Sequence, residues 1–204
     1  MDPRQSAKEK ICAAMIALLQ KTEFRKISVK QIIAEANVNR SSFYYHFGNT
    51  IDVLDYIIKE FVRKYNFSPY PIPDVSSDYS MTDIFLLCWR SCTQYAYEHQ
   101  DVVHILVQPE YRYQLFKEFE NSARNLLLNA KISYKVLDGE EQVLNHDNLF
   151  DFLSYKNAAI QLCTLDYLVT HNFIDPPDKI AEVFSTAFNL TVTNQEDYNK
   201  AFLL

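Results

Sequence analysis

The sequence predicts an all-α protein in which a small three-helix head precedes a larger helical body. The chain has 204 residues but only two glycines, too few for a protein rich in turns or sheets. Apolar residues recur at helical spacing through most of the chain. Residues 28–47, SVKQIIAEANVNRSSFYYHF, have the layout of two short helices joined by a three-residue turn. The length is sufficient for a head and a body with a substantial core.

The first helix is predicted to begin after Ser6 and to end near Lys21. Ser6 and Glu9 have the spacing of a capping box, in which the two residues satisfy free amide groups at a helix start. The apolar residues that follow recur at helical spacing and form one core stripe. They are Ile11, Met15, Leu18 and Leu19.

The next helix has equally specific start and stop signals. Ser28 and Gln31 form a second capping box, with Ile27 and Ile32 placed as its hydrophobic staple. Asn37 follows the apolar face of this helix, and asparagine tolerates the left-handed conformation that a tight helix exit requires. The pattern therefore predicts a helix over 29–36 that ends in a turn.

A third short helix is predicted from Arg40 to about Tyr45, capped by Asn39. Phe43 and Phe47 are four residues apart and share one face, which predicts their burial. The remaining side chains point outward and supply hydroxyls, a positive charge and aromatic edges, which are the groups that contact bases and phosphates. They are Arg40, Ser41, Ser42, Tyr44 and Tyr45. The plainer alternative is a solvated helix within an ordinary helical domain.

The rest of the chain predicts further helices and one clear boundary. Residues 66–80, NFSPYPIPDVSSDYS, contain three prolines with clustered serines and aspartates, which is typical of a boundary loop. Residues 131–148 are expected to be a loop or a frayed helix. Helices are expected after Asn49, over 81–99, 101–109, 110–130 and 149–171, from Pro176 and Pro177 onward, and as a short tail helix near Ala201.

Charge is divided unevenly between the two ends of the sequence. The net charge is −6, yet residues 1–65 hold 11 Lys and Arg against 7 Asp and Glu. The remaining residues are strongly acidic. A basic head on an acidic body directs attraction for a polyanion to one end of the molecule.

The segment Ile27–Leu54, and FYYHF at 43–47 above all, resembles the DNA-binding domain of TetR-family transcriptional regulators. The resemblance extends over roughly residues 6–60. It implies a helix-turn-helix DNA-binding domain at 1–48, a linking helix at about 49–65, and a ligand-binding and dimerisation body at 66–204. It also implies a homodimer that reads a near-palindromic operator in double-stranded DNA. Most family members repress and release DNA when a small-molecule effector binds, and a minority activate.

Matched position by position, the resemblance implies contacts with DNA at Ser28, at residues 39–46 and at Thr50. Three positions depart from the family pattern. Asn37 replaces the usual turn glycine, Ile33 replaces a small residue, and Thr50 stands where a lysine commonly meets phosphate, which should weaken affinity without altering sequence preference. The DNA-contacting residues are expected to be Ser28, Asn39, Arg40, Ser41, Ser42, Tyr44, Tyr45, His46 and Thr50.

Aromatic residues in the body predict a ligand cavity and a dimer interface, and the alternative for each residue is a place in the protomer's own core. An aromatic cavity with a few polar groups is typical of a small-molecule site. The candidate ligand-binding residues are Trp89, Tyr95, His104, Tyr113 and Phe116. Two helices that are apolar over much of their circumference suit a symmetric four-helix interface. Its candidate residues are Phe152, Tyr155, Ala159, Leu162, Phe184 and Phe188.

Several other classes of protein find no support in the sequence. No glycine-rich phosphate loop, His-Glu-x-x-His pair or Gly-x-Ser-x-Gly elbow is present, so we expect neither an enzyme nor a cofactor. The four cysteines have no metal-binding spacing and are interpreted as buried, reduced thiols. No signal peptide or long apolar span occurs, so we expect a cytoplasmic protein without membrane contact. The competing hypothesis is a dimeric module of the same ancestry that binds a partner protein and does not itself read DNA.

Overall fold

The computed structural model describes residues 6–66, 81–129, 133–135, 141–143 and 147–192, and the side chains of 6–66, 86–125 and 151–186. Apart from Asn66, the predicted boundary loop at 66–80 lies outside the described residues, as do all residues beyond 192. The elements in order are α1 (Ala7–Leu19), a 3₁₀ turn (Phe24–Lys26), α2 (Val29–Ala36), α3 (Arg40–His46), α4 (Thr50–Asn66), α5 (Met81–Glu98), α6 (Gln100–Leu106), α7 (Pro109–Asn129), β1 (Ser133–Lys135), β2 (Glu141–Val143), α8 (Asp147–Thr170) and α9 (Pro177–Val192).

Helices α1, α2 and α3 pack around one buried cluster and form the head. Side chains from all three helices and from the first half of α4 fill this cluster. Its fully buried members include Ile11, Met15, Ile32, Phe43 and Val53. Because short helices are marginal alone, their stability depends on this shared apolar core.

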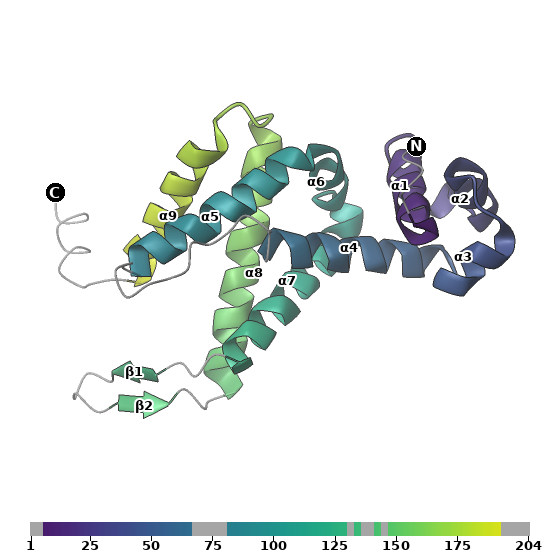
Figure 1. The fold of residues 1–204 in the computed structure, drawn as a ribbon. Coiled ribbons are helices and arrows are strands. Elements are labelled where there is room, and N and C mark those ends of the chain that lie inside the picture. The colour runs from purple at the N-terminus through teal and green to yellow at the C-terminus, as the bar shows by residue number, and fades with distance from the viewer. Residues whose placement is uncertain (1–5, 67–80, 130–132, 136–140, 144–146, 193–204) are drawn as a thin grey trace.

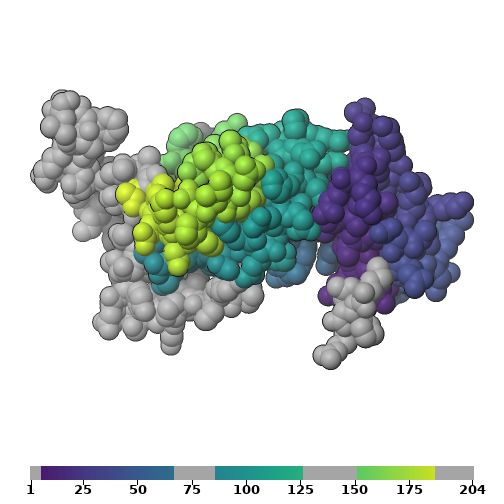
Figure 2. Space-filling view, turned by 90° about the horizontal axis from the view of Figure 1, so that it is seen from above, coloured from purple at the N-terminus to yellow at the C-terminus, as the bar shows by residue number. Residues whose placement is uncertain are grey.

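Helix α4 connects the head to the body (Figure 1). Its first half contributes Val53 and Ile57 to the head cluster, and its second half contributes Phe61 and Tyr65 to the body cluster. In the body, α7 packs against α8 and α5 packs against α9. Figure 2 shows the head at one end of the molecule and the body helices at the other. No helix in the described ranges is long and apolar enough to cross a membrane.

The described helices confirm the predicted order, with bounds that differ by a few residues. The predicted loop or frayed helix at 131–148 is wrong in part, because β1 and β2 pair there as an antiparallel hairpin, Ser133 opposite Val143. Strands of three residues are too short to show a clear alternation of apolar and polar positions. The tail helix predicted near Ala201 falls outside the described residues.

The turn between α8 and α9 is built from two residues in the left-handed region. Asn172 has φ 51° and Phe173 has φ 52°, which is unusual for a bulky side chain. Phe173 is nevertheless buried, with its ring 5.2 Å from that of Tyr97 on α5. Tyr97 also donates a hydrogen bond to the backbone carbonyl of Asp175. Tertiary contacts with α5 therefore hold this turn in a conformation that local preference opposes.

Tyr65 gives a stability prediction, because its hydroxyl is buried without a hydrogen-bond partner among the described residues. Its ring stacks on Phe61 and meets Phe119 edge-on, contacts that phenylalanine would keep. An unsatisfied buried hydroxyl costs about 1–3 kcal/mol. We therefore expect Tyr65→Phe to leave the free energy of unfolding unchanged or to raise it by about 1 kcal/mol, measured by urea denaturation.

Tyr111→Phe is the matched control, because that hydroxyl contacts Glu110 and the backbone of Phe24. This variant should lose stability where Tyr65→Phe does not. A fall of more than about 1 kcal/mol in Tyr65→Phe would mean that its hydroxyl is paired.

Candidate nucleic-acid interface

Helix α2 begins with the capping box that the sequence predicts. The backbone amide of Gln31 donates to Ser28 Oγ over 3.4 Å, and the amide of Ser28 donates to Gln31 Oε1 over 2.9 Å. Ile27 and Ile32, the predicted staple residues, are both buried. These contacts fix where the helix starts and leave Ser28 exposed at its amino end, where free amides favour a phosphate.

The turn between α2 and α3 also forms as predicted. Asn37 lies in the left-handed region, with φ 51° and ψ 49°. Asn39 then caps α3, since its Oδ1 accepts a 2.7 Å hydrogen bond from the amide of Ser42. Together the two asparagines set the angle at which α3 leaves the turn.

Helix α3 has one buried face and one exposed face. Phe43 and Phe47 are buried in the head cluster, and their rings lie 6.2 Å apart. Tyr45 is 84% exposed and Tyr44 is 47% exposed. Arg40 and Ser41 are exposed at the amino end of the helix. A short helix anchored on one side and polar on the other can enter a major groove of DNA.

The exposed side chains of α3 are ordered by contacts with one another. The Arg40 guanidinium lies 5.5 Å from the centre of the Tyr44 ring, within the range of a cation–π contact. The rings of Tyr45 and His46 meet edge-on at 4.9 Å. Ser42 and His46 are half-buried, so they lie at the margins of the surface. Seven of the nine predicted DNA-contacting residues thus lie on α3 or at its cap.

The start of α4 adds a second polar segment beside α3. The side chain of Asn49 accepts hydrogen bonds from the amides of Ile51 and Asp52, at 2.7 and 3.1 Å. Thr50 is the first residue of the helix and is half-buried. Sequence reasoning missed one cation here, Lys8, whose Nζ lies 3.6 Å from the centre of the Tyr56 ring and 5.9 Å from that of Phe47. No local spacing links Lys8 to α4, because the contact joins helices far apart in sequence.

The five predicted ligand-binding residues have different surroundings in the structure. Trp89 is buried and stacks on Phe184 of α9 at 5.6 Å. Tyr95 lines a pocket next to α4. His104 is exposed beside Phe173, and Tyr113 is 75% exposed. Phe116 is half-buried and meets Tyr155 edge-on.

The predicted dimer residues divide between surface and core. Phe152 and Tyr155 are 63% and 59% exposed on α8. Ala159 is half-buried, and Phe184 lies between the rings of Trp89 and Tyr167. Leu162 is buried in the protomer's own body cluster. The side chain of Phe188 lies outside those described.

All four cysteines are free thiols, but their burial differs from the sequence interpretation. Cys92 is buried and Cys12 and Cys88 are half-buried, whereas Cys163 is exposed. Burial raises the pKa of the Cys12 thiol to about 12, because a thiolate is poorly solvated inside the protein.

This pKa predicts the reactivity of Cys12, since only the thiolate is alkylated. At pH 8 we expect iodoacetamide to modify Cys12 roughly a thousandfold more slowly in the folded protein than in urea. The rate in the folded protein should continue to rise beyond pH 9, the ordinary pKa of the thiol. Peptide mass spectrometry over pH 7–10 measures both rates. A plateau near pH 9 in the folded protein would contradict the burial of this thiol.

Comparison with known proteins agrees with this geometry. Residues 11–57 match the family model described as "Bacterial regulatory proteins, tetR family". A putative TetR-family regulator from Syntrophomonas wolfei has a similar solved structure, with a TM-score of 0.63 and 14% identity over 92% of this chain and 95% of that one. The TetR regulator from Streptococcus agalactiae gives a TM-score of 0.53 and 20% identity, covering 89% and 92%. The fatty acid degradation regulator FadR from Bacillus halodurans gives 0.58 and 14%, covering 91% and 95%.

A search of curated protein sequences finds no match. The match to the family model shows that residues 11–57 are a tetR-family domain. The similar solved structures show that the whole chain has the fold of TetR-family transcriptional regulators. The family model confirms, over residues 11–57, the resemblance that was expected over roughly residues 6–60.

Proposed function

We propose that the protein is a homodimeric, cytoplasmic transcriptional repressor that binds a near-palindromic operator and is released by a small-molecule effector. The observation that supports DNA reading most directly is α3, which buries Phe43 and Phe47 and exposes Arg40, Tyr44 and Tyr45. In this proposal residues 1–48 are the DNA-binding domain, 49–65 the linking helix and 66–204 the regulatory and dimerisation domain.

The residues proposed to contact DNA divide into two groups by their place on the head. Arg40, Ser41, Tyr44 and Tyr45 project from α3 and read base edges or the flanking phosphates. The second group lies around α3, at helix starts or at its end, and fixes the register of the head on the phosphate backbone. It comprises Ser28, Asn39, Ser42, His46 and Thr50.

A homodimer is supported by a stripe of exposed and half-exposed side chains along α8. They recur three or four residues apart, so they share one helix face. They are Phe152, Tyr155, Ala159, Cys163 and Tyr167. A second copy packed on this stripe would place two recognition helices on one side of the duplex. Two heads bind one face only when they are about 34–36 Å apart, one helical turn of DNA.

Release by an effector requires that effector and operator prefer different arrangements of the two heads, so that each weakens binding of the other. Helix α4 is suited to this coupling, because it contributes side chains to both buried clusters. A change in the body that tilts α4 therefore moves the head as well.

Selection of bound fragments from genomic DNA, followed by gel retardation at several salt concentrations, tests the proposal. We expect one enriched near-palindromic sequence whose binding constant falls linearly with salt on logarithmic axes. Random duplex should be retarded only weakly and only at low salt. In vitro transcription from the selected promoter then gives the sign of regulation. No retardation of any fragment at any salt would favour the protein-interaction module instead.

A further inference from the structure

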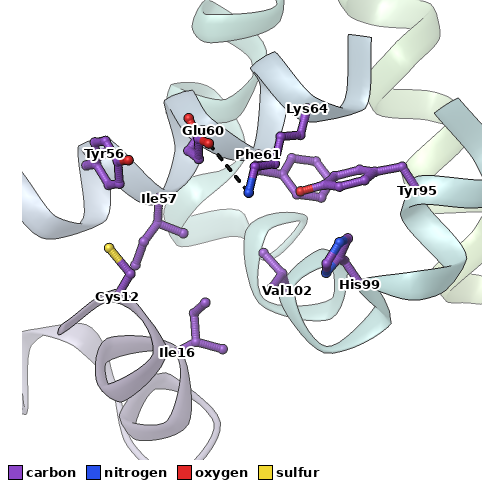
Figure 3. A pocket seen from close by; sticks show the side chains of 10 residues that line it. All are labelled: Cys12, Ile16, Tyr56, Ile57, Glu60, Phe61, Lys64, Tyr95, His99 and Val102. Carbon is purple, nitrogen blue, oxygen red and sulfur yellow. Dashed lines mark ion pairs between the residues drawn. The ribbon is translucent and has the colours of Figure 1, made fainter. Parts of the chain in front are cut away.

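A pocket of about 180 Å³ lies where the head meets the body. Cys12 and Ile16 of α1 line it from the head, and Tyr95 of α5, with His99 directly after that helix, lines it from the body (Figure 3). Helix α4 forms the wall between them. An apolar cavity of roughly this size accommodates a single aromatic ring.

The walls combine aromatic faces with aliphatic side chains. The rings of Phe61 and Tyr95 lie 5.6 Å apart, and those of Tyr95 and His99 lie 4.3 Å apart. Burial next to Glu60 raises the pKa of Tyr95 to about 12, so its hydroxyl remains a neutral donor at physiological pH. Such a lining favours a flat, apolar ring that can offer a hydrogen-bond acceptor.

A charged group with a net positive charge lies at the edge of the pocket, where Glu60 and Lys64 line the wall and Arg63 pairs with Glu60 from outside it. Arg63 donates to Glu60 over 2.7 and 2.9 Å, and Lys64 Nζ lies 3.5 Å from the same carboxylate. Two cations thus meet one carboxylate, which leaves a positive charge uncompensated within this triad. Figure 3 shows the Lys64 side chain extending toward the space between Glu60 and Tyr95. A ligand carboxylate there can accept hydrogen bonds from Lys64 and from the Tyr95 hydroxyl.

We infer that this pocket binds a single-ring aromatic acid, and that its occupancy regulates the orientation of the head relative to the body. The regulatory part rests on the proposed function, whereas the binding part does not. An occupant contacts α1 on one side and α5 on the other, so it binds more tightly to one head orientation than to others. That difference in affinity is what shifts a conformational equilibrium.

Contacts away from the pocket provide a pivot for this motion. Phe24, in the 3₁₀ turn of the head, meets Tyr111 of α7 edge-on at 6.5 Å. Gln114 of α7 donates a hydrogen bond to Asp55 of α4. Neither contact involves a residue that lines the pocket. A ring inserted between α1 and α5 would therefore tilt the head about these contacts.

Calorimetric titration of the full-length protein with benzoate tests the binding, with benzyl alcohol as the uncharged analogue. We expect benzoate to bind with a Kd on the order of 1 mM. Lys64→Gln should weaken benzoate roughly tenfold and leave benzyl alcohol unchanged, because only the acid uses the cation. Lys59→Gln is the matched control, since Lys59 is exposed on α4 and does not line the pocket.

Two further measurements locate the binding and test its consequence. Benzoate should protect Cys12 from alkylation, and Val102→Phe, which narrows the pocket, should abolish both binding and protection. Saturating benzoate should change operator affinity by roughly 5- to 150-fold in the unaltered protein and not in Val102→Phe.

The assignment of the site would be wrong if benzoate did not bind at a concentration ten times the expected Kd. It would also be wrong if neither Lys64→Gln nor Val102→Phe weakened the binding of benzoate. If benzoate protected Cys12 from alkylation but did not change operator affinity, the inference that the pocket regulates the orientation of the head would be wrong. Binding of benzoate by a protein that retards no DNA would support the site and refute the proposed function, so the two failures are distinguishable.

Discussion

Tyr45→Ala is expected to lower operator affinity roughly a hundredfold while leaving the free energy of unfolding unchanged. Tyr45 is 84% exposed on α3, so its removal takes no packing from the head core. A hydrogen bond to a charged group such as phosphate contributes about 1.5–3 kcal/mol. Because each dimer would use two copies, the combined loss is about 3 kcal/mol or more. Gel retardation with the selected operator measures the affinity, and circular dichroism in urea measures the stability.

Arg40→Ala is a second test of whether α3 contacts DNA, and it measures the loss of a phosphate contact. Its guanidinium lies over the Tyr44 ring at the exposed start of α3. Loss of one phosphate contact should reduce the slope of log affinity against log salt by about 1 for each head. The matched control for both variants is Tyr113→Ala, a body tyrosine that is 75% exposed on α7. Operator affinity unchanged in both Tyr45→Ala and Arg40→Ala would refute α3 as the recognition helix.

The head could be predicted almost completely from sequence because its signals are local. Each capping box joins residues three apart, and Asn37 carries its own preference for the left-handed conformation. Phe43 and Phe47 are four apart, so their common face follows from helix geometry alone. Short-range rules of this kind need no knowledge of the rest of the fold.

The body could be predicted only as a series of helices, because its helices are apolar on more than one side. Leu162 and Phe152 both fit an interface by sequence, yet Leu162 lies in the protomer's core and Phe152 on its surface. Helical spacing identifies a shared face but not which neighbour covers it. The aromatic residues of 85–119 are likewise separated, since Tyr95 lines the pocket whereas Tyr113 points to solvent.

Contacts between distant segments account for the other features that sequence could not predict. Lys8 lies over Tyr56, which follows it by nearly fifty positions. Phe173 adopts a left-handed conformation because Tyr97 and His104 surround its ring, not because phenylalanine prefers it. The pocket itself joins α1, α4 and α5, so no single stretch of sequence contains its pattern.

Phe43→Ala should have the largest effect on stability, because Phe43 is the buried side chain within α3 that packs in the head core, and Phe47 follows directly after the helix. Phe43 is fully buried and is the only buried residue within this seven-residue helix. Truncating a buried phenylalanine to alanine costs about 3–5 kcal/mol. A helix of this length is not stable alone, so we expect α3 to detach and operator binding to be lost. Denaturation in urea and hydrogen exchange of the α3 amides measure the two effects.

Two variants of the same helix separate loss of the anchor from loss of a DNA contact. Phe43→Leu keeps most of the buried volume and should cost less than about 1.5 kcal/mol, with operator binding retained. Tyr44→Ala removes the exposed neighbour of Phe43 and should weaken operator binding without faster exchange in α3, because its ring meets Phe43 only edge-on from outside the core. If Phe43→Ala left exchange in α3 unchanged, the cap at Asn39 and the turn at Asn37 would have to hold the helix by themselves. Burial of the Phe43 ring would then be a consequence of the local turn geometry and not the reason that α3 packs against the head.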